Sequence, residues 1–595
     1  MNKKISSSEV NNKNDAESNE KVDYDQLLSS AGEFGRFQVR LFFSTIPYYA
    51  FGGFVYFSQV FITQVPTNHW CWIPELENLT DIDRKTLAIP LDSNATQKCQ
   101  HGWEFNKSEI PYPTIGTEAE WFCEKNSYQA TAQSVFFVGS IVGGFLVGWL
   151  ADRFGRIPAL IFANMIGCLG GVVSIFANDI VIFSICRFIV GLSYDNCFMM
   201  AYLIILEYVA PKYRSLMGNI PFSLFFTLGL VILPWIALAC GHWKVTALAT
   251  SLPLLITLLT PWILPESPRW LLHKGRVDDT IEKVKTIAKT NRTVIPEKTI
   301  EAFKKTIAAD DSEGETQTMM DMLKNPLLRR AFLSLCLLYM CCMAVFDGLV
   351  RCAGDLDFDF FLSFTLVSIT EFPSIFLLAF IMDYTGRKML SIVALTICGI
   401  FSILTGFIGG GIASVVCAML ARFFVNMSSN VSFQWGAEII PTPVRGSAVA
   451  IIHICGYIAT AISPFIAYLS NIYLWLPLVL IGIISFAGAL LSLSLPETAK
   501  KDLPQTFVYE VETKGFRMFT IQMKFCSSII TRNYTLVHSN YTKFFMQFLH
   551  NLNKQAENDS MEPFVRESDL HLAGEHIADV KIRCCTKSAQ QLSKN

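Results

Sequence analysis

Long apolar runs separated by short polar segments fill most of the 595-residue chain. Twelve runs have roughly the 20 residues that a helix needs to cross about 30 Å of hydrocarbon. Each run is apolar on all sides, which favours a helix in lipid over a soluble amphipathic helix. The predicted spans are 39–63, 128–149, 158–177, 180–206, 217–240, 245–264, 331–351, 358–382, 389–409, 412–439, 446–470 and 472–494. The pattern predicts an all-α, multi-pass membrane protein with too many spans for a heptahelical receptor.

The polar segments divide the chain into parts. Residues 1–33 contain no apolar run of the kind found in a cleaved signal peptide, so we expect the first span to act as an uncleaved anchor. A second polar segment follows the sixth span. The expected organisation is an N-terminal segment (1–38), a six-helix half (39–264), a connecting segment (265–330), a second six-helix half (331–496) and a C-terminal tail (497–595).

Basic residues in the short loops predict the orientation. They gather in the loops after spans two, four and eight, and such loops face the cytosol. The short loops on the other face are nearly free of Lys and Arg, and Lys244 and Arg351 are exceptions near span ends. We therefore expect both termini in the cytosol and the protein in the plasma membrane. The cytosolic basic residues are Arg153, Arg156, Lys212, Arg214, Arg387 and Lys388.

The long loop 64–127 is expected outside the cell. It contains three glycosylation sequons, which begin at Asn78, Asn94 and Asn106. The same loop carries three cysteines in a compartment where disulfides persist. Because the count is odd, one thiol is free or pairs elsewhere, with Cys352 as one candidate, and the pairing stays open. The loop cysteines are Cys71, Cys99 and Cys123.

Composition excludes several classes of protein. Hydrophobic residues make up 52% of the chain and charged residues only 16%, against about 25% charged in soluble domains. A soluble enzyme, a disordered scaffold and a nucleic-acid binder are excluded. The net charge of −2 is a sum over three compartments and indicates no partner. We find no nucleophile–base pairing, metal-ligand spacing, cofactor loop or G-x-x-x-x-G-K-[ST] motif, so we expect a non-enzyme without cofactor or metal that does not pump with ATP.

Three motifs recur at one offset of 231 residues. Asp152-Arg-Phe-Gly-Arg156 is echoed by Asp383-Tyr-Thr-Gly-Arg387, and Pro265-Glu-Ser267 by Pro496-Glu-Thr498. An acid and a following arginine, Glu207 with Arg214, return as Glu438 with Arg445. Three matches at one offset indicate a duplicated six-helix unit whose motifs lie at the cytosolic ends of the second, fourth and sixth spans.

These motifs predict a gate rather than a solute site. An acid at a helix end and an arginine on a neighbouring turn can pair between helices, and breaking such pairs lets two halves rock about a central site. Two parallel six-helix halves are the layout of major facilitator transporters. The predicted gating residues are Asp152, Gly155, Arg156, Glu207, Arg214, Asp383, Gly386, Arg387, Glu438 and Arg445.

The residues resemble that superfamily closely. GWLADRFGR (148–156) is similar to its loop motif G-x-x-x-D-x-x-G-R, although Ile157 departs from the usual basic residue. More narrowly, the chain resembles the solute-carrier family of organic cation, carnitine and organic anion transporters over about residues 24–499. That resemblance implies the twelve-helix major facilitator fold and polyspecific carriage of small charged solutes. It rests on GEFGRFQ (32–38), CQHGWEF (99–105), EWFCEKNSY (120–128), PESPRWLL (265–272), EFP (371–373), AEIIPTPVRG (437–446), SPF (463–465) and LPET (495–498).

Three acids within the spans are candidates for binding a cationic solute. An ionisable group inside a membrane is costly unless a partner or a water-filled cavity compensates it. Asp195 stands where the cation branch of the family resembles a lysine, Asp347 lies in FDGL, and Glu371 in EFP is similar to a glutamate of that branch. The alternative is that these acids form packing ion pairs or proton sites. For Asp195 the alternative is a salt bridge with Arg187 or Arg422.

The position whose charge differs between the cation and anion branches of this family carries an uncharged residue in this chain. Seven residues before Pro464 the cation branch has an aspartate and the anion branch an arginine, whereas this chain has Tyr457. Its ring could stack on a cation. Phe198 and Phe346, beside two of the acids, and Asn430 and Gln434 in the tenth span are further lining candidates. Each could instead be packing, as we expect for His453.

Three classes of function remain. The first is a facilitative, membrane-potential-driven carrier of organic cations working by alternating access. The second is a carrier of anions or zwitterions such as carnitine, with or without a coupled ion. The third is a receptor or channel. The expected partners are small charged organic solutes and membrane lipid, without nucleic acid, and the oligomeric state stays open.

Overall fold

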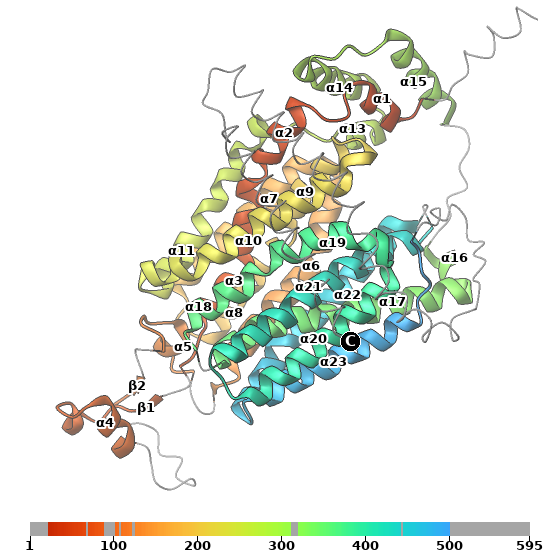
Figure 1. Ribbon diagram of the computed structural model, residues 1–595. Helices are drawn as coiled ribbons and strands as arrows, with labels where there is room; N and C mark the ends of the chain where they lie inside the picture. Colours follow the sequence, from red (N-terminus) through yellow and green to blue (C-terminus); the bar gives the residue numbers. More distant parts are fainter. Residues whose placement is uncertain are drawn as a thin grey trace, which may run out of the picture. The chain divides into compact units, whose positions relative to one another are not determined.

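Long helices account for most of the computed structural model, which describes residues 22–66, 69–88, 101–105, 109–121, 125–310, 319–356, 358–441 and 444–499 (Figure 1). By length and composition, eleven helical stretches of this described part can cross a membrane. They comprise α6 (Tyr128–Phe154), α7 (Arg156–Val173), α8 (Ile180–Ser193) with α9 (Asn196–Glu207), α10 (Arg214–Cys240), α11 (Trp243–Ser251) with α12 (Thr260–Ile263), α17 (Pro326–Arg351), α18 (Phe360–Ile369) with α19 (Glu371–Thr385), α20 (Arg387–Ile408), α21 (Ile412–Ile439), α22 (Arg445–Tyr468) and α23 (Leu476–Leu493).

The first predicted span is divided into two helices. The chain turns at Thr45 between α2 (Arg36–Ser44) and α3 (Ile46–Ile62), and Pro47 lies in the first turn of the second helix. Helix α3 has 17 residues, at the lower end of the length that spans a bilayer. With α3 counted, the helices match the twelve runs predicted from the sequence.

Two spans are broken near their middle. Helices α8 and α9 meet at Asp195, whose φ is +63°, and the Asn196 N–H donates to the Tyr194 carbonyl at 2.7 Å. This i to i+2 bond with positive φ forms a rare and strained γ-turn. Helices α18 and α19 meet at Thr370, directly before Glu371. Discontinuous helices of this kind commonly place polar groups at transporter midplanes.

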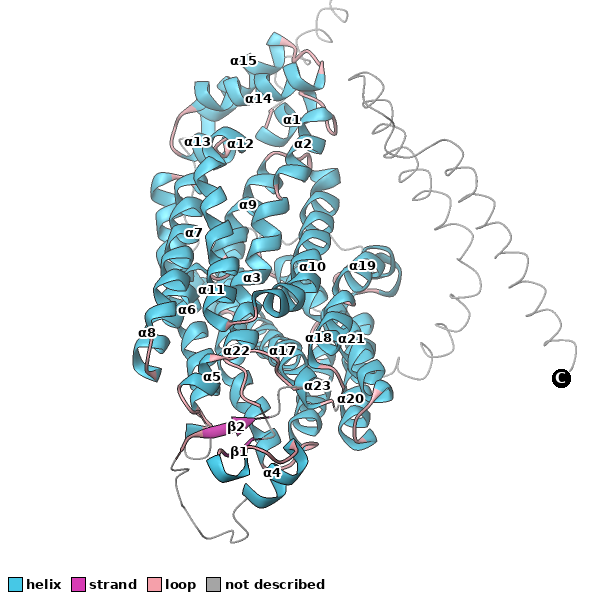
Figure 2. Ribbon diagram, turned by 90° about the vertical axis from the view of Figure 1, so that its left-hand side faces the viewer, coloured by secondary structure: helices cyan, strands magenta, loops and turns pink. Residues whose placement is uncertain are grey.

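Each half packs around its own helix pairs. In the first half, α6 lies against α8 and α3 against α10; in the second, α20 lies against α21 and α23, and α17 against α22. The α6–α8 contact depends on small residues, because a Cβ at Gly139 would lie 2.2 Å from the Phe188 carbonyl oxygen. The halves meet where α6 contacts α22 and α10 contacts α18 (Figure 2).

The two ends of the helix bundle carry different elements, and we name them accordingly. The loop end bears α4 (Asp81–Ala88), α5 (Ile115–Glu118) and the antiparallel pair β1 (His69–Cys71) and β2 (Trp103–Phe105) (Figure 1). The motif end bears α1 (Tyr24–Ser30), α13 (Pro268–His273), α14 (Val277–Asn291) and α15 (Glu297–Asp310) (Figures 1 and 2). Helix α16 (Met319–Lys324) precedes α17.

Parts of the predicted outer loop are described. Asn78 lies exposed on the surface, and Cys71 is disulfide-bonded. Asn94, Asn106, Cys99 and Cys123 lie outside the described residues, as does nearly all of the predicted tail 497–595. Glycosylation of the three sequons stays a prediction.

Candidate functional site

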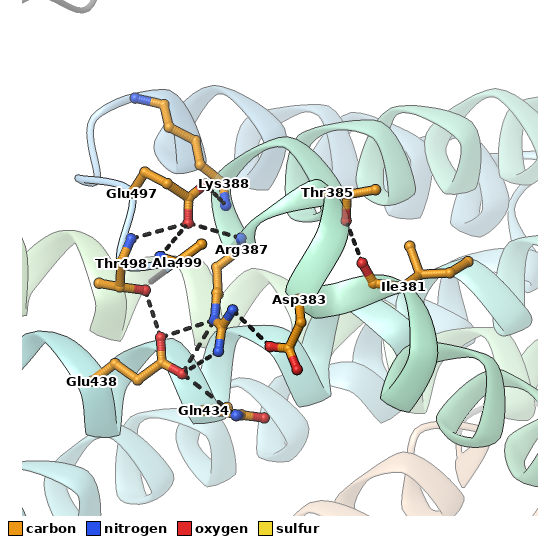
Figure 3. Close-up of polar contacts among 10 residues, drawn as sticks. All are labelled: Ile381, Asp383, Thr385, Arg387, Lys388, Gln434, Glu438, Glu497, Thr498 and Ala499. Atoms are coloured by element: carbon orange, nitrogen blue, oxygen red, sulfur yellow. Dashed lines mark hydrogen bonds and ion pairs between the residues drawn. The ribbon is translucent and has the colours of Figure 1, made fainter. Parts of the chain in front are cut away.

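At the motif end of the second half, three of the predicted gate residues, Asp383, Arg387 and Glu438, form a side-chain network (Figure 3). The Arg387 guanidinium donates to the Glu438 carboxylate from Nε at 2.9 Å and from Nη2 at 2.8 Å. It also reaches Asp383 at 3.2 Å, and the Thr498 hydroxyl donates to Glu438 at 2.5 Å. A fork-shaped guanidinium on one carboxylate is the stronger geometry for such a pair. The network joins α19, α20, α21 and the segment after α23.

A carboxylate also caps the first turn of α20 from another part of the chain. Glu497 accepts the Arg387 and Lys388 backbone N–H groups at 2.9 and 3.0 Å. Unpaired N–H groups at a helix start and its dipole both favour an anion there. Gly386 has a φ of +78°, and a Cβ there would lie 2.6 Å from a Glu497 carboxylate oxygen. Glycine is therefore required by conformation and by space.

The first half repeats this cap. Glu266 accepts the N–H groups of Arg156 and Ile157, at the start of α7, at 2.8 and 3.2 Å. Gly155 has a φ of +113°, and its Cβ would again lie 2.6 Å from the carboxylate. The motif repetition in the sequence thus corresponds to a repeated local geometry. Glu266 and Glu497 were not among the predicted gate residues, although their PES and PET motifs were noted.

The side-chain network of the first half is different. Arg156 donates to Asp152 at 2.7 Å, but its Nε and the Glu207 Oε2 are buried without hydrogen-bond partners among the described residues. Ser267, the counterpart of Thr498, bonds to Glu207. Among the described residues, the first half has no guanidinium–glutamate pair that corresponds to the pair of Arg387 and Glu438.

An acid from the N-terminal segment takes part instead. Asp25 in α1 accepts short hydrogen bonds from Arg214 and Arg269. The Tyr24 hydroxyl donates to the Glu207 carbonyl at 2.7 Å, and the Arg269 guanidinium lies 5.1 Å from the Tyr24 ring centroid. Burial alone would raise the pKa of Asp25, but the bonds and charges of Arg214 and Arg269 hold it below its usual value.

The predicted pairing of each glutamate with the arginine seven positions later is not what forms. Arg214 pairs with Asp25, and Glu438 pairs with Arg387. Arg445 directs its Nε to the Ile440 carbonyl at 3.2 Å. The reason is local, because Arg214 and Arg445 begin α10 and α22 and their side chains fold back onto the preceding turn.

Two of the three predicted solute-binding acids are ion-paired. Asp347 is fully buried and accepts from Arg351 Nε at 2.5 Å and from the Tyr56 hydroxyl at 2.8 Å. Glu371 is 3% exposed and accepts from Arg422 Nη2 at 3.2 Å. The alternative of packing ion pairs thus describes both acids in this structure. Their assignment to solute binding stays a prediction.

Asp195 has different surroundings. It lies partly exposed at the γ-turn between α8 and α9 and accepts a hydrogen bond from the Tyr457 hydroxyl on α22, in the opposite half. His453 Nδ1 lies 3.5 Å from the same hydroxyl. In the described part of the chain no arginine or lysine forms an ion pair with Asp195. Arg187, once its candidate partner, contacts the Ser174 hydroxyl and the Phe183 ring.

Aromatic rings surround this acid. Tyr194 stacks on Tyr56 with ring centroids 4.5 Å apart and lies 5.9 Å from Tyr457. Tyr339 of α17 stacks on His453 at 5.4 Å. Tyr457 was predicted from the sequence and the other rings were not, because an aromatic residue in an apolar run carries no signal of the face it occupies.

The remaining candidates have other side-chain partners. Phe198 follows Asp195 by one helical turn, and its backbone N–H donates to the Asp195 carbonyl at 3.3 Å. Phe198 packs inside the first half against Phe222 and Phe226. Phe346 lies under the Arg422 guanidinium, at 3.3 Å from ring centroid to Cζ. Asn430 donates to Asn426, and Gln434 donates to Glu438 and so joins the gate network.

A few contacts link the halves across the centre and the loop end. Besides the Tyr56–Asp347 bond, Arg351 donates a short bond to Gln133 on α6, and the Ser134 hydroxyl donates to the Ala461 carbonyl on α22 at 2.6 Å. No contact between the halves was predicted for Arg351, which stood out in the sequence only as an exception to the orientation pattern. A basic residue one turn after an acid on a helix, as at 347 and 351, was the signal available.

Comparison with known proteins places the chain in a family. Residues 93–506 match the model of the "Sugar (and other) transporter" family. The chain is 28% identical to solute carrier family 22 member 3 of Mus musculus over 83% of its own length and 96% of that protein. It is 28% identical to the organic cation transporter protein of Drosophila melanogaster, covering 81% and 93%, and 25% identical to organic cation/carnitine transporter 2 of Homo sapiens, covering 83% and 95%.

Solved structures agree on the fold. The proton:xylose symporter XylE, bound to 6-bromo-6-deoxy-D-glucose, superimposes with a TM-score of 0.54 at 18% identity over 78% of this chain and 98% of that one. Its inward-open form gives a TM-score of 0.53 at 16% identity, covering 78% and 97%. The fold class and the resemblance expected from the sequence are confirmed. The chain belongs to the sugar (and other) transporter family of the major facilitator superfamily, and it is a multi-pass membrane transporter rather than an enzyme.

Proposed function

We propose that this protein carries small organic cations across the plasma membrane by alternating access of its two halves, with both termini in the cytosol. One observation carries the proposal. Asp195 is a partly exposed carboxylate at a helix break, has no arginine or lysine ion pair in the described residues, and faces Tyr457 of the opposite half. A carboxylate beside aromatic rings suits a cation with an apolar body.

The neighbouring charges leave Asp195 as the available anion. Asp347 and Glu371 are each neutralised by an arginine. Isolated charge at the centre of a membrane is costly, so an arriving cation would be stabilised where a carboxylate lacks such a partner. The names of the relatives, an organic cation transporter protein and an organic cation/carnitine transporter, support the same class of solute. Polyspecificity would follow from rings that recognise a cation without fixed hydrogen-bond geometry.

The membrane potential is a sufficient driving force. It contributes about 2.3 kcal/mol per charge at 100 mV, which corresponds to roughly 50-fold accumulation of a monovalent cation. No coupled ion is required for that gradient.

The alternative is a carrier of zwitterions such as carnitine. The balanced charge around Arg351 and Arg422 favours it, because a solute carboxylate could exchange with Asp347 or Glu371. The position of Tyr457, which bears no charge, is compatible with both solutes.

Radiotracer uptake distinguishes these functions. Cells expressing the chain receive tetraethylammonium, carnitine or para-aminohippurate, with and without depolarising potassium. We expect saturable tetraethylammonium uptake that falls on depolarisation. Uptake of carnitine alone would favour the zwitterion carrier, and uptake of para-aminohippurate alone would overturn both.

A further inference from the structure

Arg351, at the loop end of α17, is a cation already held in a cation-binding arrangement. Its Nε and Nη2 donate to Asp347 at 2.5 and 3.2 Å, and its Nη1 donates to Gln133. The guanidinium carbon lies 5.5 Å from the Phe137 ring centroid. The Arg351 side chain is 4% exposed and that of Asp347 is 0% exposed. A carboxylate, an aromatic face and an amide oxygen together form a suitable site for a guanidinium or ammonium group.

Both halves contribute to this arrangement. Asp347 and Arg351 belong to the second half, whereas Tyr56 of α3, and Gln133 and Phe137 of α6, belong to the first. The Gln133 amide is itself fixed, because its Nε2 donates to the Thr63 hydroxyl at 2.8 Å. The loop end can therefore open only if Arg351 leaves Gln133 and Tyr56 leaves Asp347.

We propose that Arg351 is a tethered cation that closes the loop end of the carrier. When that end opens, the cationic head of an entering solute replaces Arg351 on Asp347, a contact that precedes the binding of the solute at Asp195. The replacement of Arg351 by a solute rests on the proposed function. The closure of the loop end by Arg351 does not. The solute class it names is small organic cations with a guanidinium or primary ammonium head. Such heads have the N–H donors that Arg351 now supplies.

The physical reason is charge compensation. If Arg351 swings away with no substitute, Asp347 becomes an uncompensated buried carboxylate, which strongly disfavours opening. A solute cation at the carboxylate removes that obstacle, so opening of the loop end is coupled to the presence of a cation. A ligand can shift such an equilibrium only through this kind of difference in affinity between two states.

The test measures opening directly, without flux. Ser140 lies on α6 two turns beyond Gln133, and seven residues of helix bring it to the same face. It is 1% exposed. We call the contacts of Arg351 with Asp347 and Gln133 the lock. The substitution S140C places a thiol on the motif-end side of the lock, and an impermeant maleimide added outside the cell labels it only when the loop end opens. Mass spectrometry of the labelled peptide separates this thiol from the native cysteines.

The lock predicts the effect of three variants in this background. R351Q removes the tethered charge, and Q133A removes the amide that accepts a hydrogen bond from it in the other half. We expect each variant to speed labelling about tenfold, because each loses a hydrogen bond to a charged group. K244Q is the matched control, because Lys244 is also a basic residue near the loop end but pairs with Glu118 at the surface. It should leave labelling unchanged. Surface biotinylation corrects for the amount of protein. If S140C, S140C/R351Q and S140C/Q133A are all labelled at the same rate, the lock is overturned.

The replacement step has its own readout. Methylguanidinium should speed labelling of S140C several-fold, and tetraethylammonium, which has no N–H donor, should do so less. Neither should act on the S140C/D347N chain. No response to methylguanidinium in the intact chain would overturn the replacement. If the lock variants open the protein while no cation uptake is found, the lock stands and the proposed function fails.

Discussion

The motif ends of the two halves have the same sequence motifs but different side-chain networks. In both halves a glutamate after the sixth helix, Glu266 or Glu497, caps the helix that begins with the arginine of the loop motif. Only in the second half does that arginine, Arg387, also hold a glutamate. In the first half, Glu207 bonds to Ser267 but forms no ion pair with an arginine among the described residues, and α1 supplies Asp25 to the neighbouring arginines.

This difference teaches which parts of the duplication are structural and which are adjustable. The cap satisfies backbone N–H groups that any helix start at this position would expose, so it is needed twice. The arginine–glutamate pair is a side-chain contact that can be exchanged for another. The second half is closed by its own residues, whereas the first depends on a segment outside the repeat. We expect the N-terminal segment to control the first half alone.

The largest expected effect is shared by the halves. G155A and G386A each place a methyl group 2.6 Å from a capping carboxylate in a left-handed backbone. We expect a loss of about 2 kcal/mol or more of stability in each, measured as thermal unfolding of the purified protein. G411A is the control, since Gly411 has a φ of +78° and a ψ of −172°, close to the backbone of Gly386, but open space around its Cβ. A loss in G411A as large as in G386A would show that the cap is not the cause.

The next largest expected loss of stability should differ between the halves. R387A leaves Glu438 largely buried without its partner, which we expect to cost about 2–3 kcal/mol. R156A breaks a pair with an Asp152 carboxylate that is 79% exposed, expected to cost about 0.5 kcal/mol. The same unfolding assay compares them. Equal losses would contradict the asymmetry.

The N-terminal attachment should matter only to the first half. D25N removes the acceptor of two arginines, and we expect faster proteolysis of the segment before α2 with the Arg387 network intact. Because the pKa of Asp25 is held below its usual value, the attachment is complete at neutral pH and is lost as the pH falls below about 4. E33Q is the control, as Glu33 pairs with an exposed Lys212 at 3.6 Å. Unchanged proteolysis in D25N would contradict this role.

The smallest effects come from the exposed acids of the motif. Asp152 and Asp383 are 79% and 67% exposed in their pairs with the arginine four residues later. D152N and D383N should each cost no more than about 0.5 kcal/mol in the unfolding assay. A larger loss in D152N alone would indicate that Asp152 substitutes for the missing glutamate contact of the first half.

The sequence predicted the helices and the repeat because both depend on local information. Apolar runs of sufficient length fix the spans, and an identical offset of three motifs fixes the duplication. The break at Asp195 was not predicted, since no glycine or proline marks it. The broken first span at Thr45 was also missed, although Pro47 lies two residues after it.

Side-chain partners were predicted less well. The arginines that neutralise Asp347 and Glu371 are 4 and 51 residues away in the sequence. The first was visible as a helical neighbour and the second required the packing of α19 against α21. Asp25 could not be assigned to the first half from its sequence, because a polar N-terminal segment has no pattern that names its contact. Pairing across helices is decided by tertiary packing, which the spans alone do not determine.

The role of Asp195 is tested most directly by tetraethylammonium uptake in the D195N chain. Asparagine tolerates positive φ as aspartate does, so this change removes the charge and keeps the γ-turn. The intact chain, Y457F and D195N are compared at equal surface expression. We predict that D195N abolishes saturable, potential-dependent uptake while Y457F, which keeps the ring, retains it with altered affinity. Uptake by D195N with unchanged affinity would contradict the account.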